Sequence, residues 1–444
     1  MNYTVIGAGK SGIAAALLAK SLNNNVFLTE SKPAEDYINE IIELEKAEIA
    51  YEFGGNTEQA FSSCDCFITC PGVLPSTWII SQADKRGIPV ISEPEFASLF
   101  LKNPIIAITG TNGKTTTTTI ITFILNNSGK KAIACGNIGL PLSSLVGNID
   151  DETILVVEMS SFQLDRIDKF HPDVAMILNI TPDHLYYHQT MDQYSEAKWK
   201  ISLNQNENNL LILNFDDEAI RPRRGNIQAK IAYVSTQSRV QGAFVRDGEM
   251  MINYFSQQEE EKIMLTSEIG IPGTHNYYNS MCAALAARAF EVTNENIRDS
   301  LIAFQGVEHR LEHVRTLNGV DFINDSKATN VNSTWYALSS YDRPIVWIAG
   351  GRGDNNDYTS LNGFVQENVK AIVAIGEEQD AIFNHFASMV RCVRSENLED
   401  SVNTAVELAS EDDVVLFSPS CKSFDMFVNF EHRGESFKEI VRNL

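Results

Sequence analysis

The chain has 444 residues, of which 43% are hydrophobic and 21% charged, and these fractions are typical of a soluble globular protein. At roughly 150 residues per domain, the length predicts about three domains. The net charge of −23 opposes binding to nucleic acid and to anionic membranes, so we expect neither as a partner. An anionic substrate must therefore be held by local donors.

The N-terminus leads straight into a strand-like run, without a signal peptide, and no apolar segment approaches the roughly 20 residues of a membrane span. Cys64, Cys66 and Cys70 lie close together, but their spacing matches no common zinc pattern. We interpret them as buried free thiols, with a metal site or a disulfide as the alternative. These features predict a cytoplasmic protein, and we expect a monomer.

Residues 1–95 alternate strand-like and helix-like segments, as a Rossmann-like unit does. The expected strands are 3–6, 25–29, 66–69 and 89–92. Gly7, Gly9 and Gly12 follow the first of them in a G-x-G-x-x-G pattern, and Glu30 lies where a ribose-binding acid usually sits. Alone, the pattern suggests NAD or FAD. Physically it requires only that a diphosphate-bearing nucleotide rests on a helix N-terminus.

Residues 96–303 form a second unit around the stretch 104–116. An apolar run stops at Gly110, and Gly113, Lys114 and Thr115 open a helix. The inward N–H groups of such a loop and the helix N-terminus make a phosphate cradle. Lys114 can reach the β- and γ-phosphates, and the Thr115 hydroxyl suits Mg²⁺. Ile108 stands where the general Walker pattern has its first glycine, so the loop is a shortened variant. It predicts ATP binding.

Further polar residues close the expected strands of this unit, 154–157 and 174–180. Function is expected at the carboxyl ends of such buried parallel strands. Glu158 can take Mg²⁺ there, with a solvated or helix-capping glutamate as the alternative. His184 and Lys198, taken singly, read as surface residues.

The remainder of this unit departs from the parallel pattern. We expect β-hairpins near 231–265 with a turn at 246–248, followed by an alanine-rich helix at 276–290.

Residues 304–444 repeat the strand and helix rhythm, with strands expected at 320–324, 345–349, 371–375 and 414–417. Polar loops follow two of these strands, which suggests a site for a small polar ligand. Lys327, Thr329 and Ser423 in these loops could hold a carboxylate. Arg310, at the start of the unit, suits a phosphate, with an interdomain salt bridge as the alternative.

Together these motifs resemble the Mur ligase family in order and spacing, over the whole chain. The stretches that carry the resemblance are 110–116 (GTNGKTT), 136–139 (GNIG), 158–164 (EMSSFQL), 309–310 (HR) and 325–330 (DSKATN). The C-terminal stretches 418–425 (SPSCKSFD) and 429–434 (NFEHRG) are similar to those of the members that use D-glutamate. The resemblance implies an α/β fold of three domains: a Rossmann-like domain (1–95), a central P-loop domain with a mostly parallel sheet (96–303) and a Rossmann-like C-terminal domain (304–444).

The resemblance also implies a reaction in peptidoglycan precursor synthesis, on small-molecule substrates. ATP phosphorylates the L-alanine carboxylate of UDP-N-acetylmuramoyl-L-alanine. The amine of D-glutamate then attacks the acyl phosphate, and phosphate leaves. Positioning and neutralisation of charge on the transferring oxygens are the tasks of such a protein.

Site residues follow from the resemblance position by position. The catalytic group comprises Lys114, Glu158, His184, Lys198 and Arg310. ATP is held by Gly110, Thr111, Asn112, Gly113, Lys114, Thr115, Thr116, Asn276, Arg310 and Asp325. The UDP substrate is held by Lys10, Ser11, Gly12, Glu30, Ser31, Cys70, Pro71, Gly72 and Asn137. D-glutamate is held by His184, Lys327, Thr329, Ser423 and Phe430. Two Mg²⁺ sites draw on Thr115, Glu158, His184 and Lys198, the last as a carbamate.

One departure from the family pattern concerns the glutamate side chain. Where the family has a lysine soon after a Gly-Gly pair, this chain has Arg352 early and Asp354 near that place. Arg352 is the candidate substitute for holding the side-chain carboxylate.

Three other functions stay open. Another Mur-type ligase or a folylpolyglutamate ligase would keep the chemistry and change the amino acid. A nicotinamide- or flavin-dependent oxidoreductase would explain residues 7–12 but not residues 110–116. A non-catalytic regulator would bind ATP without releasing phosphate.

Overall fold

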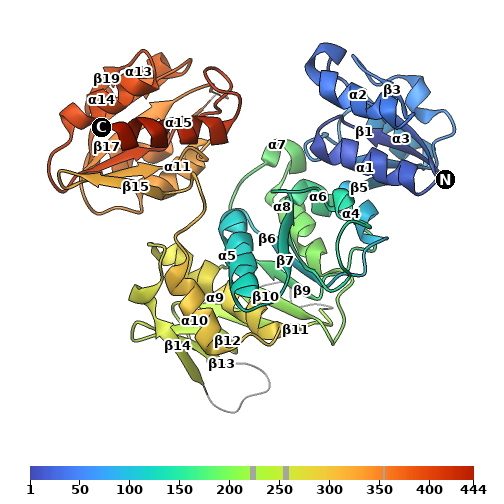
Figure 1. Cartoon of the computed structure of the whole chain (residues 1–444), viewed down its shortest axis with the longest axis horizontal. Coiled ribbons are helices and arrows are strands. Elements are labelled where there is room, and N and C mark those ends of the chain that lie inside the picture. Colours follow the sequence, from blue (N-terminus) through green and yellow to red (C-terminus); the bar gives the residue numbers. More distant parts are fainter. Residues whose placement is uncertain (221–226, 254–259, 354–355) are drawn as a thin grey trace. The chain divides into compact units, whose positions relative to one another are not determined.

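A computed structural model describes residues 1–220, 227–253, 260–353 and 356–444. These residues form two compact units (Figure 1), each described here by itself. Unit 1 contains Met1–Gly270 and Thr274–Phe304, and unit 2 contains Ile271–Gly273 and Gln305–Leu444. The described residues form three separate, mostly parallel sheets flanked by helices, which confirms the predicted α/β class. The division of unit 1 into two domains at residue 95 stays a prediction.

The N-terminal sheet of unit 1 is parallel throughout, with the strand order β3-β2-β1-β4-β5. Its strands are β1 (Asn2–Ile6), β2 (Asn25–Thr29), β3 (Ala50–Glu52), β4 (Cys66–Thr69) and β5 (Val90–Ser92). Its helices are α1 (Lys10–Ser21), α2 (Ile38–Lys46) and α3 (Trp78–Arg86). Apolar residues of α1 and α2 cover one face, and those of α3 cover the other. Because β1 lies between β2 and β4, the loops after these three strands meet at a topological switch point, where ligands bind in such folds.

The central sheet of unit 1 has the order β14-β13-β12-β11-β10-β9-β6-β8-β7. Its strands are β6 (Ile105–Thr109), β7 (Ala132–Gly136), β8 (Ile154–Glu158), β9 (Val174–Ile177), β10 (Leu210–Asn214), β11 (Lys230–Ser235), β12 (Gly242–Arg246), β13 (Glu249–Asn253) and β14 (Glu261–Leu265). The associated helices are α4 (Glu93–Ser98), α5 (Lys114–Asn127), α6 (Ser161–Asp165), α7 (Leu185–His188), α8 (Met191–Trp199), α9 (Thr274–Ala289) and α10 (Asn294–Ala303). Strand β6 lies between β8 and β9, so the phosphate loop leaves the sheet at a second switch point.

Strand β6 shows why this sheet is buried on both sides. All five of its residues are buried, and successive side chains point to opposite faces. Ile105 and Ala107 pack in the cluster that includes residues of α6 and α8. On the other face α5 and α9 pack against each other and against the sheet (Figure 1). Because both faces of the sheet are covered, a central parallel strand such as β6 is expected to be a continuous apolar run.

The region after β10 confirms one part of the hairpin prediction and corrects another. β12 and β13 are antiparallel, and Asp247 and Gly248 between them have φ of 52° and 77°, as a two-residue hairpin turn requires. β13 and β14 are also antiparallel. β11, however, pairs with β12 in parallel, so it continues the main sheet and is not a hairpin strand. Local turn residues marked the hairpin, but the pairing of β11 depends on non-local contacts.

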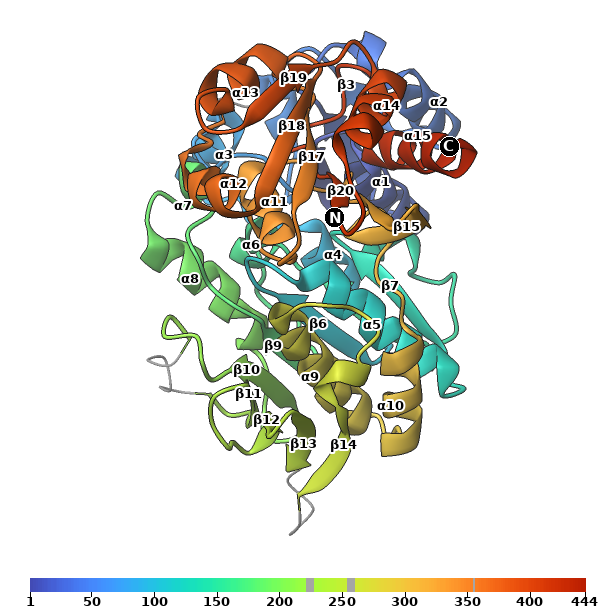
Figure 2. The same ribbon diagram turned by 90° about the vertical axis from the view of Figure 1, so that its left-hand side faces the viewer.

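The sheet of unit 2 has the order β15-β16-β20-β17-β18-β19, with β15 antiparallel and the others parallel. Its strands are β15 (Glu312–Leu317), β16 (Val320–Asn324), β17 (Ile345–Gly350), β18 (Val369–Ile375), β19 (Arg391–Arg394) and β20 (Val414–Phe417). Its helices are α11 (Val331–Leu338), α12 (Asn362–Asn368), α13 (Gln379–Phe386), α14 (Leu398–Leu408) and α15 (Phe430–Asn443). Helices α11, α12 and α13 pack on one face of the sheet, and α14 and α15 pack on the other (Figure 2).

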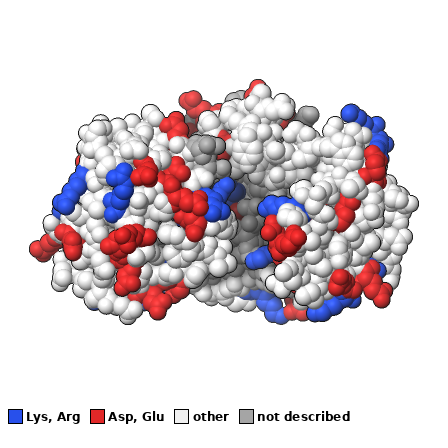
Figure 3. Space-filling model, turned by 90° about the horizontal axis from the view of Figure 1, so that it is seen from above, with Lys and Arg blue, Asp and Glu red and all other residues white. Residues whose placement is uncertain are grey.

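Acidic side chains lie across the surface of both units on the face shown in Figure 3, with lysine and arginine interspersed. This distribution fits the net charge of −23. The seven cysteines are free thiols. Cys66 is buried, as expected, and burial raises its pKa to about 12, whereas Cys64 and Cys70 are half-buried. None of the helices described is long and apolar enough to cross a membrane.

Candidate active site

The phosphate loop connects β6 to α5 at the centre of the central sheet. Helix α5 begins at Lys114, and Gly113 before it has φ of 83°. A side chain at Gly113 would also come 2.5 Å from the Asn279 Oδ1 atom, so both the backbone angle and the close approach of α9 require glycine there. The first N–H groups of α5 have no partner within the helix and face the loop. The predicted phosphate cradle therefore has the expected local structure.

Lys114 lies folded back onto this loop. Its Nζ atom donates to the carbonyl oxygens of Gly110, at 3.0 Å, and Thr111, at 2.9 Å. The ammonium group is thus held at the mouth of the cradle, where a phosphate would accept its charge-assisted hydrogen bonds.

Thr115, Glu158 and Asn137 meet at the carboxyl ends of β6, β8 and β7. The Thr115 hydroxyl donates to Glu158 Oε2 at 2.9 Å, and the Asn137 amide donates to Glu158 Oε1 at 2.8 Å. A hydroxyl and a carboxylate so close together are the oxygen donors that Mg²⁺ prefers beside phosphates. Glu158 is 2% exposed, which excludes the solvated-glutamate alternative. Asn137, expected to contact the UDP substrate, contacts Glu158 directly.

Lys198 is the second lysine at the phosphate loop. It is 1% exposed, and its Nζ atom donates to Gly110 O at 2.8 Å. Burial, and then the charge of Lys114, hold its pKa well below the ordinary value for a lysine. The surface alternative is therefore wrong for Lys198.

His184 lies beside the two lysines and adopts a left-handed conformation with φ of 53°. Its Nε2 atom is 3.4 Å from Asp183 Oδ2. Burial lowers the pKa of His184, the Asp183 carboxylate opposes this, and the charges of Lys114 and Lys198 lower it further. The neutral imidazole is favoured, so His184 can act as a ligand or as a proton acceptor.

Two asparagines that the sequence analysis missed shape the phosphate loop. Asn179, just after β9, accepts from the Asn112 N–H at 2.8 Å and donates to the Asn112 carbonyl at 3.0 Å. Asn279 donates to Asn276 Oδ1 at 2.9 Å, which fixes the predicted Asn276 beside the loop. Asn179 falls within the strand predicted at 174–180, but β9 ends at Ile177, so the prediction placed Asn179 inside the strand and not after it. Asn279 stands one turn after Asn276 on α9, which is a weak signal.

The predicted UDP cradle lies at the switch point of the N-terminal sheet. A side chain at Gly12 would come 1.9 Å from Gly7 O, so α1 and the loop before it pack in direct backbone contact. Glu30, which is buried, accepts from the Ala8 N–H at 2.9 Å and the Lys32 N–H at 2.9 Å. Cys70 follows β4 and packs its Sγ atom against Gly7 O at 3.5 Å.

The remaining predicted residues of this cradle surround its opening. Ser31, Pro71 and Gly72 are exposed in the loops after β2 and β4, and Lys10 and Ser11 form the first turn of α1. The structure thus brings together the glycine loop and the loops after β2 and β4.

In unit 2, the predicted residues follow the carboxyl ends of β16 and β20. The Lys327 Nζ atom lies 5.6 Å from the centre of the Phe430 ring. Ser423 is buried and Thr329 half-buried in the two polar loops. Asp325 is buried, accepts from Ser418 Oγ at 2.8 Å and from the Leu311 N–H at 3.2 Å, and burial raises its pKa to about 7. Asp325 therefore holds the loop after Arg310.

Arg352 lies beside the loop after β20. Its backbone exchanges two hydrogen bonds with Lys422, at 2.8 and 3.0 Å, next to the predicted Ser423. Its guanidinium forms a paired contact with the exposed carboxylate of Glu377, at 2.8 and 3.0 Å. Asp354 lies outside the described residues.

Comparisons with known proteins agree with this geometry. The family model "Mur ligase MurD-like, N-terminal domain" matches residues 1–92, "Mur ligase middle domain" matches 108–287, and "Mur ligase, glutamate ligase domain" matches 309–421. The chain belongs to the Mur ligase family. This Mur ligase is 42% identical to the UDP-N-acetylmuramoylalanine--D-glutamate ligase of Salinibacter ruber, over 99% of its own length and 97% of the relative's.

Other relatives carry the same name. The chain is 40% identical to the Bacteroides fragilis protein, with 100% of both chains covered, and 38% identical to that of Christiangramia forsetii, with 100% and 99% covered.

Solved Mur ligases share the fold of this chain. The MurC ligase of Thermotoga maritima matches with a TM-score of 0.58 and 19% identity, covering 100% of this chain and 99% of its own. A MurF ligase of Acinetobacter baumannii matches with a TM-score of 0.61 and 16% identity, covering 98% and 93%. At these identities the likeness concerns the fold.

Proposed function

We propose that this Mur ligase joins D-glutamate to UDP-N-acetylmuramoyl-L-alanine at the expense of ATP, in peptidoglycan precursor synthesis. Relatives of this name match the chain over nearly its full length, which supports the proposal. The observation that carries the chemistry is the cluster of Lys114, Thr115, Glu158 and Lys198 at one switch point. A dinucleotide-dependent oxidoreductase has no use for this cluster.

Lys114 and the N–H groups of the phosphate loop hold the β- and γ-phosphates of ATP. They stabilise charge on the transferring oxygens while the substrate carboxylate attacks the γ-phosphorus. The bond from that phosphorus to ADP breaks, ADP leaves and an acyl phosphate results. Asn276 supports the loop through Asn279. Arg310 and Asp325, which match ATP-binding positions of the family, contribute to nucleotide binding.

Thr115 and Glu158 supply the oxygen ligands of one Mg²⁺, which neutralises phosphate charge when bound. Asn137 holds the second oxygen of Glu158 and so orients the carboxylate. His184 and Lys198 belong to the second proposed Mg²⁺ site. An ammonium group is no metal ligand, so Lys198 serves there only if its charge is reversed.

A carbamate on Lys198 would achieve this reversal. The neutral amine attacks carbon dioxide through its lone pair, one proton leaves the nitrogen, and a carbamate anion results. Only a neutral amine reacts in this way, and burial beside Lys114 favours the neutral form of Lys198. The carbamate would supply oxygen ligands for a bound Mg²⁺.

UDP-N-acetylmuramoyl-L-alanine binds at the switch point of the N-terminal sheet, and D-glutamate binds at the loops that follow β16 and β20. Residues of the N-terminal cradle, with Lys10, Ser11 and Gly12 on α1, hold the diphosphate on a helix N-terminus. Lys327, Thr329, Ser423 and Phe430, together with His184, hold D-glutamate, and Arg352 is the candidate for its side-chain carboxylate. We place the protein in the cytoplasm as a monomer, and its seven free thiols support a reducing compartment.

Phosphate release from ATP tests the proposal. The assay uses UDP-N-acetylmuramoyl-L-alanine, Mg²⁺ and a panel of D- and L-amino acids, with omission of each substrate as the control. D-glutamate should give turnover well above every other amino acid. Turnover with a different amino acid would assign another ligase specificity, and no turnover with any would contradict the proposal.

A further inference from the structure

Unit 2 carries Arg310 on a short segment with an unusual backbone. His309 and Leu311, on either side of Arg310, both have left-handed φ, at 61° and 45°. Such angles are costly for residues other than glycine, above all for a bulky side chain such as leucine. They persist only where surrounding contacts hold the chain in place.

Several hydrogen bonds hold this segment against the rest of unit 2. The His309 N–H donates to Glu312 Oε2 at 2.8 Å, and the His309 carbonyl accepts from the Lys327 N–H at 3.0 Å. The Leu311 N–H donates to Asp325. Asn324 lies 2.9 Å from the His309 ring and also donates to Glu312 Oε2 at 3.0 Å. Glu312 Oε2 thus accepts hydrogen bonds from both the His309 N–H and the Asn324 amide.

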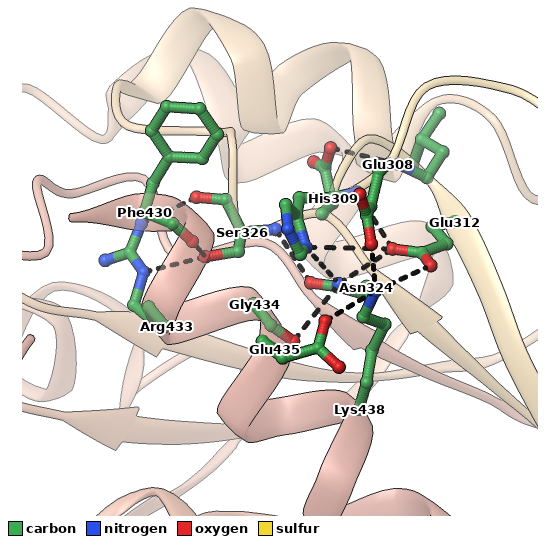
Figure 4. A network of polar contacts seen from close by, with 12 residues as sticks. Glu308, His309, Glu312, Asn324, Ser326, Phe430, Arg433, Gly434, Glu435 and Lys438 are labelled. Atoms are coloured by element: carbon green, nitrogen blue, oxygen red, sulfur yellow. Dashed lines mark hydrogen bonds and ion pairs between the residues drawn. The ribbon is translucent and has the colours of Figure 1, made fainter.

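Helix α15 packs against this segment, as Figure 4 shows. A side chain at Gly434 would come 2.3 Å from His309 Nδ1, so the imidazole packs on bare backbone of α15. One turn further along the helix lies Lys438, whose side chain is 4% exposed. Its Nζ atom is 2.5 Å from Glu308, 3.3 Å from Glu312 and 2.8 Å from Glu435.

Lys438 occupies the position of a cation among these carboxylates. The ligand atoms of Glu308, His309 and Glu435 lie within 4.8 Å of one another, a spacing that would suit a metal ion. The lysine ammonium lies among them instead. Burial lowers the pKa of Lys438, but the hydrogen bonds to Glu308 and Glu435 outweigh burial and raise it above its ordinary value. The surrounding carboxylates therefore favour the charged ammonium form.

We propose that Lys438 is a positioning residue for Arg310, acting through Glu308 and Glu312 on the strained segment between them. Without the ammonium charge the clustered carboxylates repel one another, Glu312 releases the His309 N–H, and the left-handed angles relax. Arg310 then loses its fixed direction. The inference rests on the proposed function only in taking the nucleotide as the ligand of Arg310.

Hydrogen–deuterium exchange of the full chain without ligands tests the structural step. The variants are Lys438→Met, which keeps the stem and removes the charge, and Lys438→Arg, which keeps the charge. Lys370→Met is the matched control, since Lys370 pairs with Asp413 at 2.7 Å on another part of unit 2. In Lys438→Met, amides of residues 308–312 should exchange about tenfold faster, while β16 and β20 keep their protection. Unchanged exchange at 308–312 would overturn the proposal.

Steady-state kinetics tests the functional step. Lys438→Met should raise the KM for ATP about tenfold and leave the KM for the UDP substrate within twofold, because only the direction of Arg310 changes. Lys438→Arg should recover most of this loss, and Lys370→Met should match the unmodified chain. An equal rise in all KM values, or faster exchange with an unchanged KM for ATP, would refute the positioning role.

If Lys438→Met does not fold, Glu435→Gln removes one charge at a position that is 54% exposed, and the same two measurements apply, with smaller changes expected in the same directions. If the unmodified chain releases no phosphate with any amino acid, the proposed function fails. The exchange experiment still decides then whether Lys438 holds the segment.

Discussion

Unit 1 contains two strand–glycine–helix cradles, and they differ in the charges around them. The N-terminal cradle, after β1, has a carboxylate at its loop: Glu30 accepts the Ala8 N–H at 2.9 Å. The central cradle, after β6, has two lysines whose Nζ atoms donate to Gly110 O, at 3.0 and 2.8 Å. Both use a helix N-terminus at a switch point.

The difference teaches that the backbone provides an anion site, while the side chains decide what happens to the anion. A carboxylate and a packed cysteine suit a nucleotide that is held without reacting. Two lysines beside a hydroxyl and a carboxylate suit the transfer of a phosphoryl group, because charge develops there in the transition state. Changes in the central cradle should therefore affect turnover, and changes in the N-terminal cradle should affect binding.

The largest effect should follow Lys114→Ala. Loss of the ammonium at the central cradle removes stabilisation of the transferring oxygens, and kcat for phosphate release should fall by about 10³-fold or more. The control is Lys131→Ala, which removes an exposed lysine paired with Asp150 and should leave kcat unchanged. Turnover of Lys114→Ala close to that of the unmodified chain would contradict the catalytic assignment of this cradle.

Lys198→Ala should have the next largest effect, with kcat lower by about 10²-fold. If Lys198 acts as a carbamate, short carboxylic acids should restore part of the activity, since they supply the missing oxygens. Lys114→Ala should gain nothing from the same acids. Full activity of Lys198→Ala would exclude the carbamate, and impaired activity without rescue would favour a role as an ammonium.

Gly12→Ala should weaken the N-terminal cradle without affecting the chemistry. The new Cβ atom would lie 1.9 Å from Gly7 O and 2.8 Å from Cys70 Sγ, so the loop must shift. We expect the KM for the UDP substrate to rise about tenfold, with the KM for ATP within twofold. Gly363→Ala is the control, because Gly363 lies on α12, which carries none of the predicted site residues, and nothing lies within 4 Å of its Cβ position. A fall in kcat with unchanged KM values would show that the N-terminal cradle affects turnover and not binding.

The smallest effect concerns the stability of unit 1. Glu93, on α4, is fully buried and accepts the Ser143 N–H at 2.6 Å, and burial raises its pKa to about 7. The folded state then binds a proton more tightly than the unfolded state, so the free energy of unfolding should fall between about pH 4.5 and pH 7 and level off above. This shift in the pKa of Glu93 corresponds to a change of about 3 kcal/mol at most in the free energy of unfolding.

Chemical denaturation across this pH range, with Glu93→Gln as the comparison, measures the effect. Glutamine keeps an oxygen for the Ser143 N–H and does not titrate. The unmodified chain should lose more stability than the variant as the pH rises, and parallel pH profiles would show that Glu93 does not titrate in this window.

The sequence predicted much of this architecture because the signals are local. Continuous apolar runs marked β1, β2, β4, β6 and β8, and the glycines of both cradles marked the loops that follow β1 and β6. The short strands β3 and β19 were not predicted, because none of their residues is buried and no continuous apolar run marks them. β11 was misassigned because strand direction depends on partners far away in the chain.

The sequence by itself determined the two cradles, the residues that end the parallel strands and the family, because each depends on neighbouring residues or on ordered motifs. Only the tertiary structure decided which of those residues act together. It buried Lys198 against Gly110, brought Asn137 to Glu158 and closed Lys438 on the segment that carries Arg310. Burial and charged groups on distant elements set the protonation state and the orientation of a side chain. Neither can be predicted from the residues beside it in the sequence.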